Sequence, residues 1–90
     1  MPGGEVGGDL AQLDSLSKTF DVKAKDVADL TSTIDSSLSQ TVWKGANATK
    51  FRDSWGGFKT TLQKLQGELA DASTAVRKQR EALAAATGDA

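Results

Sequence analysis

The chain has 90 residues, of which 11 are basic and 12 are acidic, and it contains no histidine, cysteine or tyrosine. This length allows one domain with a modest core. The missing residue types exclude disulfides, thiolate chemistry and the commonest general base, and the net charge of −1 gives no reason to expect nucleic acid or an anionic membrane as a partner.

Residues 1–8, MPGGEVGG, are predicted to form a flexible N-terminal arm. Four of them are glycine and one is proline, so ordering them would cost much backbone entropy. The segment has neither the basic start nor the apolar run of about 7–15 residues that marks a cleavable signal peptide. No later stretch approaches the roughly 18 apolar residues of a membrane span. We therefore expect no cleavable signal and no stable membrane insertion.

A first long helix is predicted over residues 9–42. From Leu10 to Leu38 the seam residues alternate at steps of three and four, which is the a/d spacing of a helix that packs along its length. Asp9 can cap its start. The predicted core residues of this helix recur every seven positions or close the seam: Leu13, Phe20, Val27, Ile34 and Leu38.

This first seam is interrupted and also widened. Ser17 and Thr31 place polar side chains in it, whereas Leu16 and Leu30 extend the apolar stripe to one side. A wide stripe is what a bundle helix needs, in contrast to the narrow seam of a two-stranded coiled coil.

Trp43-Lys44-Gly45 lies at the midpoint of the chain, and a turn is predicted over residues 43–46. Gly45 can adopt a left-handed or otherwise strained conformation that ends the first helix. Trp43 can bury its ring over the open end of a hairpin. Trp55-Gly56-Gly57 is a second Trp-x-Gly and could host the turn instead, although it would leave two very unequal arms.

The helical spacing returns over residues 47–87, where Asn47 can cap the start. Gly56-Gly57 and Gly67 each cost about 1 kcal/mol relative to alanine in a helix interior. The seam keeps its phase through them, so one helix with a bend or thin spot is predicted, and residues 88–90 are expected to fray. The predicted core residues here are Phe51, Trp55, Phe58, Leu62, Leu65, Leu69 and Val76.

Together these elements predict an all-α fold, an antiparallel helix-turn-helix hairpin over residues 9–87. One hairpin covers only one side of each wide stripe, so two hairpins are expected to pair into a four-helix bundle. The first helix carries six aspartates against three lysines, and the second carries seven basic against four acidic residues. These opposite net charges predict attraction between the arms, which would bias register more than stability. The alternative is that the charges are ordinary solvated faces of the two helices.

No catalytic, cofactor-binding or metal-binding residues are expected, and the protein is not expected to be an enzyme. Asp26 and Asp29 could share a cation, but two carboxylates are too few ligands. Arg77-Lys78-x-Arg80 could touch phosphate, but cations in the final turns of a helix that favour its macrodipole are the better interpretation. Trp43 and Trp55 are expected to pack in the turn and the core, and not to stack on nucleic acid bases.

In its length, its central Trp-x-Gly motif and its two helical arms, the chain resembles the WXG family of small type VII (ESX) secretion substrates, of the early-secreted-antigen type. The resemblance covers residues 9–87 and rests on chain length, the central motif and the residues Trp43, Gly45, Ala46, Ala48 and Phe51. It implies a hairpin that pairs as a homodimer or with a paralogous WXG partner. It also implies export from the cytoplasm without a cleavable signal peptide, driven by the membrane ATPase of the secretion system, and action by protein–protein contact.

One departure from the family pattern concerns export. Family members, or one member of each pair, usually carry a Tyr-x-x-x-Asp/Glu signal after the second helix, and this chain has no tyrosine. The nearest frame runs from Arg77 to Glu81, with arginine in place of the ring. Either a partner carries the signal to the ATPase, or this member uses a variant of it. The alternative function is an intracellular helical adaptor or coiled-coil scaffold with no role in secretion.

Overall fold

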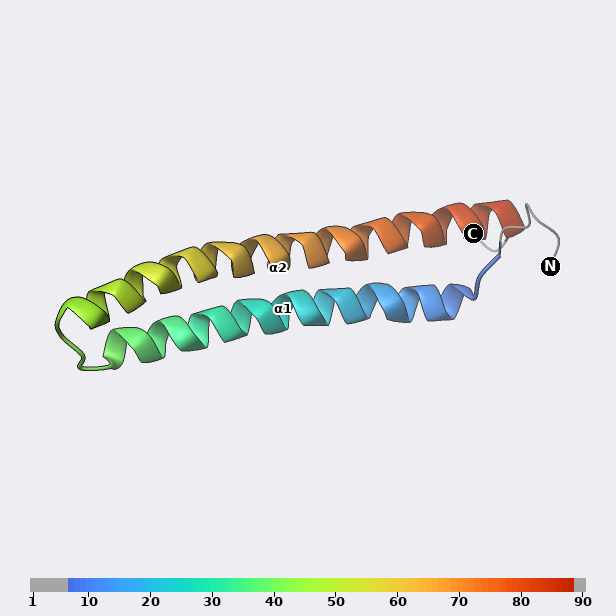
Figure 1. Cartoon of the computed structure of the whole chain (residues 1–90). Coiled ribbons are helices and arrows are strands. Elements are labelled where there is room, and N and C mark those ends of the chain that lie inside the picture. Colours follow the sequence, from blue (N-terminus) through green and yellow to red (C-terminus); the bar gives the residue numbers. More distant parts are fainter. Residues whose placement is uncertain (1–6, 89–90) are drawn as a thin grey trace.

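The structure is a computed structural model that describes residues 7–88. Two helices, α1 (Leu10–Gln40) and α2 (Ala46–Thr87), pack side by side in opposite directions (Figure 1). They form a rod with extents of 64 × 22 × 17 Å. The predicted all-α hairpin is thereby confirmed. The predicted flexible arm and frayed tail fall mostly on residues 1–6 and 89–90, which lie outside the described residues.

The ends of α1 are set by local hydrogen bonds. Asp9 caps its start, because its Oδ1 accepts a hydrogen bond from the backbone N–H of Gln12 at 3.0 Å. At the other end Thr41 is extended, and its N–H donates to the carbonyl of Leu38 at 3.3 Å. The helix therefore ends at Gln40, before the Trp-x-Gly motif.

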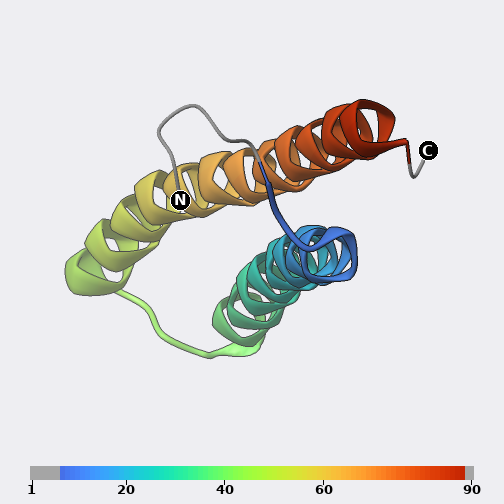
Figure 2. The same cartoon turned by 90° about the vertical axis from the view of Figure 1, so that its right-hand side faces the viewer.

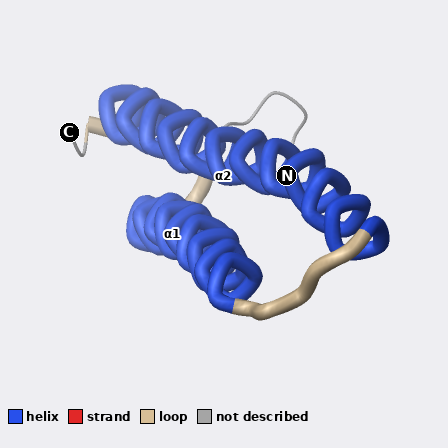
Figure 3. Tube along the Cα trace, turned by 90° about the vertical axis from the view of Figure 1, so that its left-hand side faces the viewer, coloured by secondary structure: helices blue, strands red, loops and turns tan. Residues whose placement is uncertain are grey.

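Gly45 begins α2 and does not end α1, contrary to the expected role of this glycine. Its φ of 110° lies in a region that L-residues avoid, and its carbonyl accepts the first helical hydrogen bond, from Thr49 N–H at 3.1 Å. Asn47 was expected to cap this helix, and that expectation is wrong because Asn47 already lies inside α2. The linking loop is drawn in tan in Figure 3.

Helix α2 runs unbroken through its three internal glycines, so the alternative turn at Trp55-Gly56-Gly57 is excluded. A Cβ added at Gly56, Gly57 or Gly67 would meet nothing within 4 Å. The helix closes with Gly88 at φ 80°, whose N–H bonds to the carbonyl of Ala84.

The chain just before α1 runs towards the last turns of α2 (Figures 1 and 2). A Cβ added at Gly8 would lie 3.2 Å from Leu83 Cδ2 and 3.6 Å from Leu13 Cδ1. A larger side chain at this position would therefore require the Leu83 side chain to move by a few tenths of an ångström.

Small side chains form the most buried part of the contact between the helices. Small side chains let the two helix backbones approach closely. For this reason Ser17 and Thr31, the polar residues within the first seam, are among its best-buried positions. The hydroxyls are all satisfied: Ser17 donates to the Asp14 carbonyl, Thr31 to the Val27 carbonyl and Ser73 to the Ser17 carbonyl. The buried residues are Ser17, Ala24 and Thr31 on α1 and Ala48, Ser73 and Ala84 on α2.

Candidate functional site

One flank of the hairpin is lined by ion pairs between α1 and α2. Each pair joins an aspartate of the first helix to a base of the second, which fits the opposite net charges of the two arms. All six side chains keep substantial contact with solvent, so each pair contributes little stability by itself. We call this flank the polar face, defined by Asp14–Arg80 (3.0 Å), Asp21–Arg77 (2.9 Å) and Asp35–Lys59 (3.0 Å).

The opposite flank carries large apolar side chains that the hairpin covers only in part. In each helix they lie across the buried line from the ion-paired residues, as the rotation of 3.6 residues per turn requires. Because the ion pairs bring the charged flanks together, the two apolar stripes share the remaining side of the rod. We call it the apolar face; its members, 40–66% exposed, are Leu16, Leu30, Ile34, Phe51, Phe58 and Leu65.

The predicted core residues divide between the hairpin and this face. Four are exposed, namely Ile34, Phe51, Phe58 and Leu65. The others keep only intermediate exposure: Leu13, Phe20, Val27, Leu38, Trp55, Leu62, Leu69 and Val76. A core that includes all of them would need a second molecule on the apolar face.

Asp35 is the centre of the best-connected polar cluster. Trp55 Nε1 donates to its Oδ1 at 2.9 Å, and Lys59 Nζ donates to its Oδ2 at 3.0 Å. The indole hydrogen bond first, and the Lys59 ammonium second, hold the pKa of Asp35 below its ordinary value of 3.8. The cluster joins α1 to α2 near the turn, and it places Trp55 against a carboxylate as well as beside the core.

The lowered pKa of Asp35 predicts a pH-dependent contribution to stability. A carboxyl whose pKa is lower when folded stabilises the protein above its ordinary pKa and loses that contribution as pH falls through the folded value. We expect Asp35→Asn to melt below the parent at pH 7 and to approach it below about pH 4.

Thermal melts across this range, with Asp53→Asn as a matched loss of one exposed charge, provide the measurement. An Asp35→Asn deficit that persists unchanged at pH 3 would contradict the assignment.

The turn is held by a residue that the sequence did not single out. The Arg52 guanidinium donates to the carbonyl of Trp43 at 2.8 Å and to that of Thr41 at 3.3 Å. The Trp43 ring packs on Phe51, with centroids 5.5 Å apart and planes at 47°, and stays 40% exposed. Phe51 belongs to the apolar face, so that face continues to the tip of the rod.

The charged side chains of Arg77, Arg80, Asp26 and Asp29 are all engaged in ion pairs. Arg77 and Arg80 do not serve the helix macrodipole, since they bond aspartates of α1 and the last turn of α2 has no basic residue. Asp26 and Asp29 each bind a lysine of α1, at 3.4 and 2.8 Å. Among the described residues, no group of three or more acidic, cysteine or histidine side chains could hold a metal ion.

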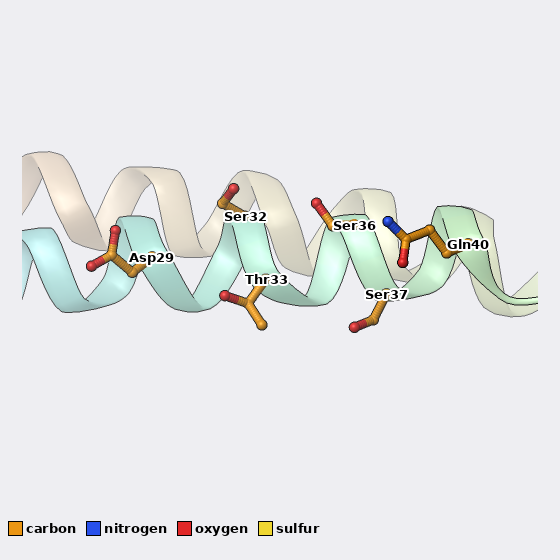
Figure 4. Close-up of a pocket in the computed structure, with 6 residues that line it drawn as sticks. All are labelled: Asp29, Ser32, Thr33, Ser36, Ser37 and Gln40. Carbon is orange, nitrogen blue, oxygen red and sulfur yellow. The ribbon is translucent and has the colours of Figure 1, made fainter.

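A shallow hollow of about 410 Å³ lies along the outer side of α1. Its hydroxyl and amide groups all come from this one helix and fan out along it, as Figure 4 shows, and do not converge on a point. This arrangement positions no group to activate another. The lining residues are Asp29, Ser32, Thr33, Ser36, Ser37 and Gln40.

Comparison with known proteins identifies one family. A model of WXG100, described as proteins of 100 residues with WXG, matches residues 7–86. No curated protein and no solved structure gives a match. Neither helix in the described part of the chain is long and apolar enough to cross a membrane.

Proposed function

The chain belongs to the WXG100 family, and we propose that it is exported as a dimer by a type VII (ESX) secretion system and acts by protein–protein contact. Proteins of this family are small helical secretion substrates that typically work as dimers.

The apolar face is the observation that carries this proposal. A small single hairpin has a limited core, and here six large apolar side chains remain 40–66% exposed on one side of it. Covering a leucine or phenylalanine side chain fully contributes roughly 1.5–3 kcal/mol. A second hairpin on this face would complete a four-helix bundle and explain why the predicted core residues exceed what one hairpin buries.

Export is proposed to start in the cytoplasm and to need no cleavable signal peptide. The driving component would be the membrane ATPase of the secretion system. Since this chain has no tyrosine, the Tyr-x-x-x-Asp/Glu signal must come from a partner or be replaced by a variant.

Secretion in a host that carries the system tests the proposal. The tagged chain is expressed in the parent strain and in a strain without the secretion ATPase, and cells and culture medium are compared by immunoblot. We expect it in the medium of the parent only, with a cytosolic enzyme as the lysis control. Retention in both strains would support the alternative, an intracellular helical adaptor, which the missing tyrosine also favours.

A further inference from the structure

The turn end of the rod carries basic side chains and no acidic one. We call this end the basic tip, defined by the loop of residues 41–45 and the first two turns of α2 as far as Arg52 (Figure 1). Its cations are Lys44, Lys50 and Arg52. The whole chain has a net charge of −1, so this excess is local and does not show in the overall balance.

No carboxylate within residues 7–88 neutralises these cations. In that part of the chain no ion pair includes Lys44 or Lys50, and both side chains are exposed. The Arg52 guanidinium donates to two neutral carbonyls, those of Trp43 at 2.8 Å and Thr41 at 3.3 Å, and keeps its charge. The basic tip therefore presents its positive charge to its surroundings.

The carboxylates that border the basic tip leave most of this charge in place. Asp35 on α1 is already bound to Lys59 at 3.0 Å. Asp53 follows Arg52 directly and lies one residue beyond the tip. With Asp53 counted as well, a net charge of +2 remains.

Apolar side chains protrude among the cations of the basic tip. Val42 is 89% exposed in the loop, and Trp43 is 40% exposed. The loop backbone that carries them is held in place, because Gly45 turns it at a φ of 110° and Arg52 bonds its carbonyls. The rod therefore ends in a fixed apolar apex that positive charges surround, and an exposed patch of this kind marks a binding surface.

We propose that the basic tip docks the protein end-on against an anionic lipid surface. Tryptophan is favoured at the level of lipid headgroups, so Trp43 and the neighbouring Val42 can enter the headgroup region. Lys44 and Lys50 then meet anionic headgroups, and each lysine near such a surface contributes about fivefold to affinity. The convex end of a rod fits a flat, yielding surface, whereas a rigid protein partner would need a pocket for Val42. Only one loop reaches the lipid, so the contact is peripheral and reversible.

The apolar face is less suited to an anionic membrane, because its charges come in pairs of opposite sign. Lys23, between the apolar residues of α1, binds Asp26 at 3.4 Å. On α2, Lys64 lies one helical turn before Glu68. A rod lying flat on this face would bring no excess of positive charge to the lipid.

The first test measures co-sedimentation of the purified full-length chain with lipid vesicles. We expect binding to vesicles of phosphatidylcholine and phosphatidylglycerol in equal parts, and binding at least about tenfold weaker to phosphatidylcholine alone. A rise in salt from about 0.1 M to about 1 M shortens the Debye length from about 10 Å to about 3 Å and should release the protein. Equal binding to both vesicles would overturn the proposal. Binding to neither would overturn it too, and would favour an acidic protein as the partner of the basic tip.

The second test removes two lysines at either of two places. Lys44→Gln combined with Lys50→Gln is expected to weaken vesicle binding about 25-fold, at about fivefold for each lysine. Lys18→Gln combined with Lys78→Gln is the matched control, because these exposed lysines also lack an ion pair within residues 7–88 and lie away from the tip. The control should bind like the parent. Equal losses in both double variants would show that net charge and not the tip governs binding.

The third test uses fluorescence to decide which part of the rod meets the lipid. Trp43 lies at the tip, whereas Trp55 is half-buried and donates its indole hydrogen bond to Asp35 at 2.9 Å. We expect the emission of the parent to shift to shorter wavelength on anionic vesicles. Trp43→Phe should still bind, because it keeps an aromatic ring, but it should show no shift. A shift that persists in Trp43→Phe would place the lipid contact elsewhere and overturn end-on docking.

Discussion

Replacing Ser73 by leucine is expected to lower the thermal midpoint of the protein by about 10 °C. Ser73 is fully buried, donates its hydroxyl to the Ser17 carbonyl at 2.9 Å and accepts from the Arg77 guanidinium at 2.9 Å. Leucine would remove both bonds and force its larger side chain between α1 and α2. Overpacking costs about 1–3 kcal/mol, and each kcal/mol shifts the midpoint by roughly 4–8 °C in a domain of this size.

Circular dichroism melts of three variants separate the causes. Ser73→Ala removes the hydroxyl without adding volume and is expected to cost about 1 kcal/mol. Thr74→Leu adds an apolar side chain at the exposed neighbouring position and should leave the midpoint almost unchanged. If Ser73→Leu melted with Thr74→Leu at the parent temperature, the helices could not approach one another at Ser73 as described.

Apolar spacing in the sequence suffices to predict two helices and their antiparallel pairing, because a seam of threes and fours has few other uses. It does not tell which stripe residues face the other helix of the same chain, since a contact within a hairpin and one between hairpins need the same spacing. Phe58 and Leu62 illustrate this: both fit the seam, but only Phe58 is exposed.

The polar interruptions of the seam show a second limit of hydropathy. Ser17 and Thr31 look like weak points in an apolar stripe, yet they are the buried positions of α1 together with Ala24. Their hydroxyls bond carbonyls of their own helix, so burial leaves no polar atom without a partner. Small volume, which lets the helices approach, matters more here than polarity.

The loop between the helices covers residues 41–45, where the sequence predicts a turn over 43–46, and the residues that hold it differ from those expected. Asn47 has the residue type of a helix cap, but Gly45 takes that position at a φ of 110°. The loop backbone is fixed by Arg52, which reaches back to the Trp43 carbonyl. Such a side-chain bond to a loop carbonyl depends on where the loop folds back, and no pattern of residue types around Arg52 announces it.

If the protein is exported as proposed, removing the Trp43 ring is expected to reduce export strongly while leaving the hairpin folded. The ring is 40% exposed at the end of the rod and packs on Phe51, so Trp43→Ala should cost only about 1–2 kcal/mol of apolar burial. The loop should keep its path, because Arg52 bonds the backbone of Trp43 and not its side chain. Stability and export therefore report on different properties of the same residue.

The expected loss of export follows from the position of Trp43 on the surface, at the end of the rod. In the proposed dimer, a partner whose second helix ends beside the Trp43 ring would bring the expected export signal next to it, and the two could form one surface for the secretion machinery. The secreted fraction of Trp43→Ala and the melting temperature of its dimer are measured together, with any partner coexpressed. Val42→Ala, at a neighbouring side chain that is 89% exposed, is the control and should be exported normally. Normal secretion of a stable Trp43→Ala dimer would leave the motif with a role in the turn alone.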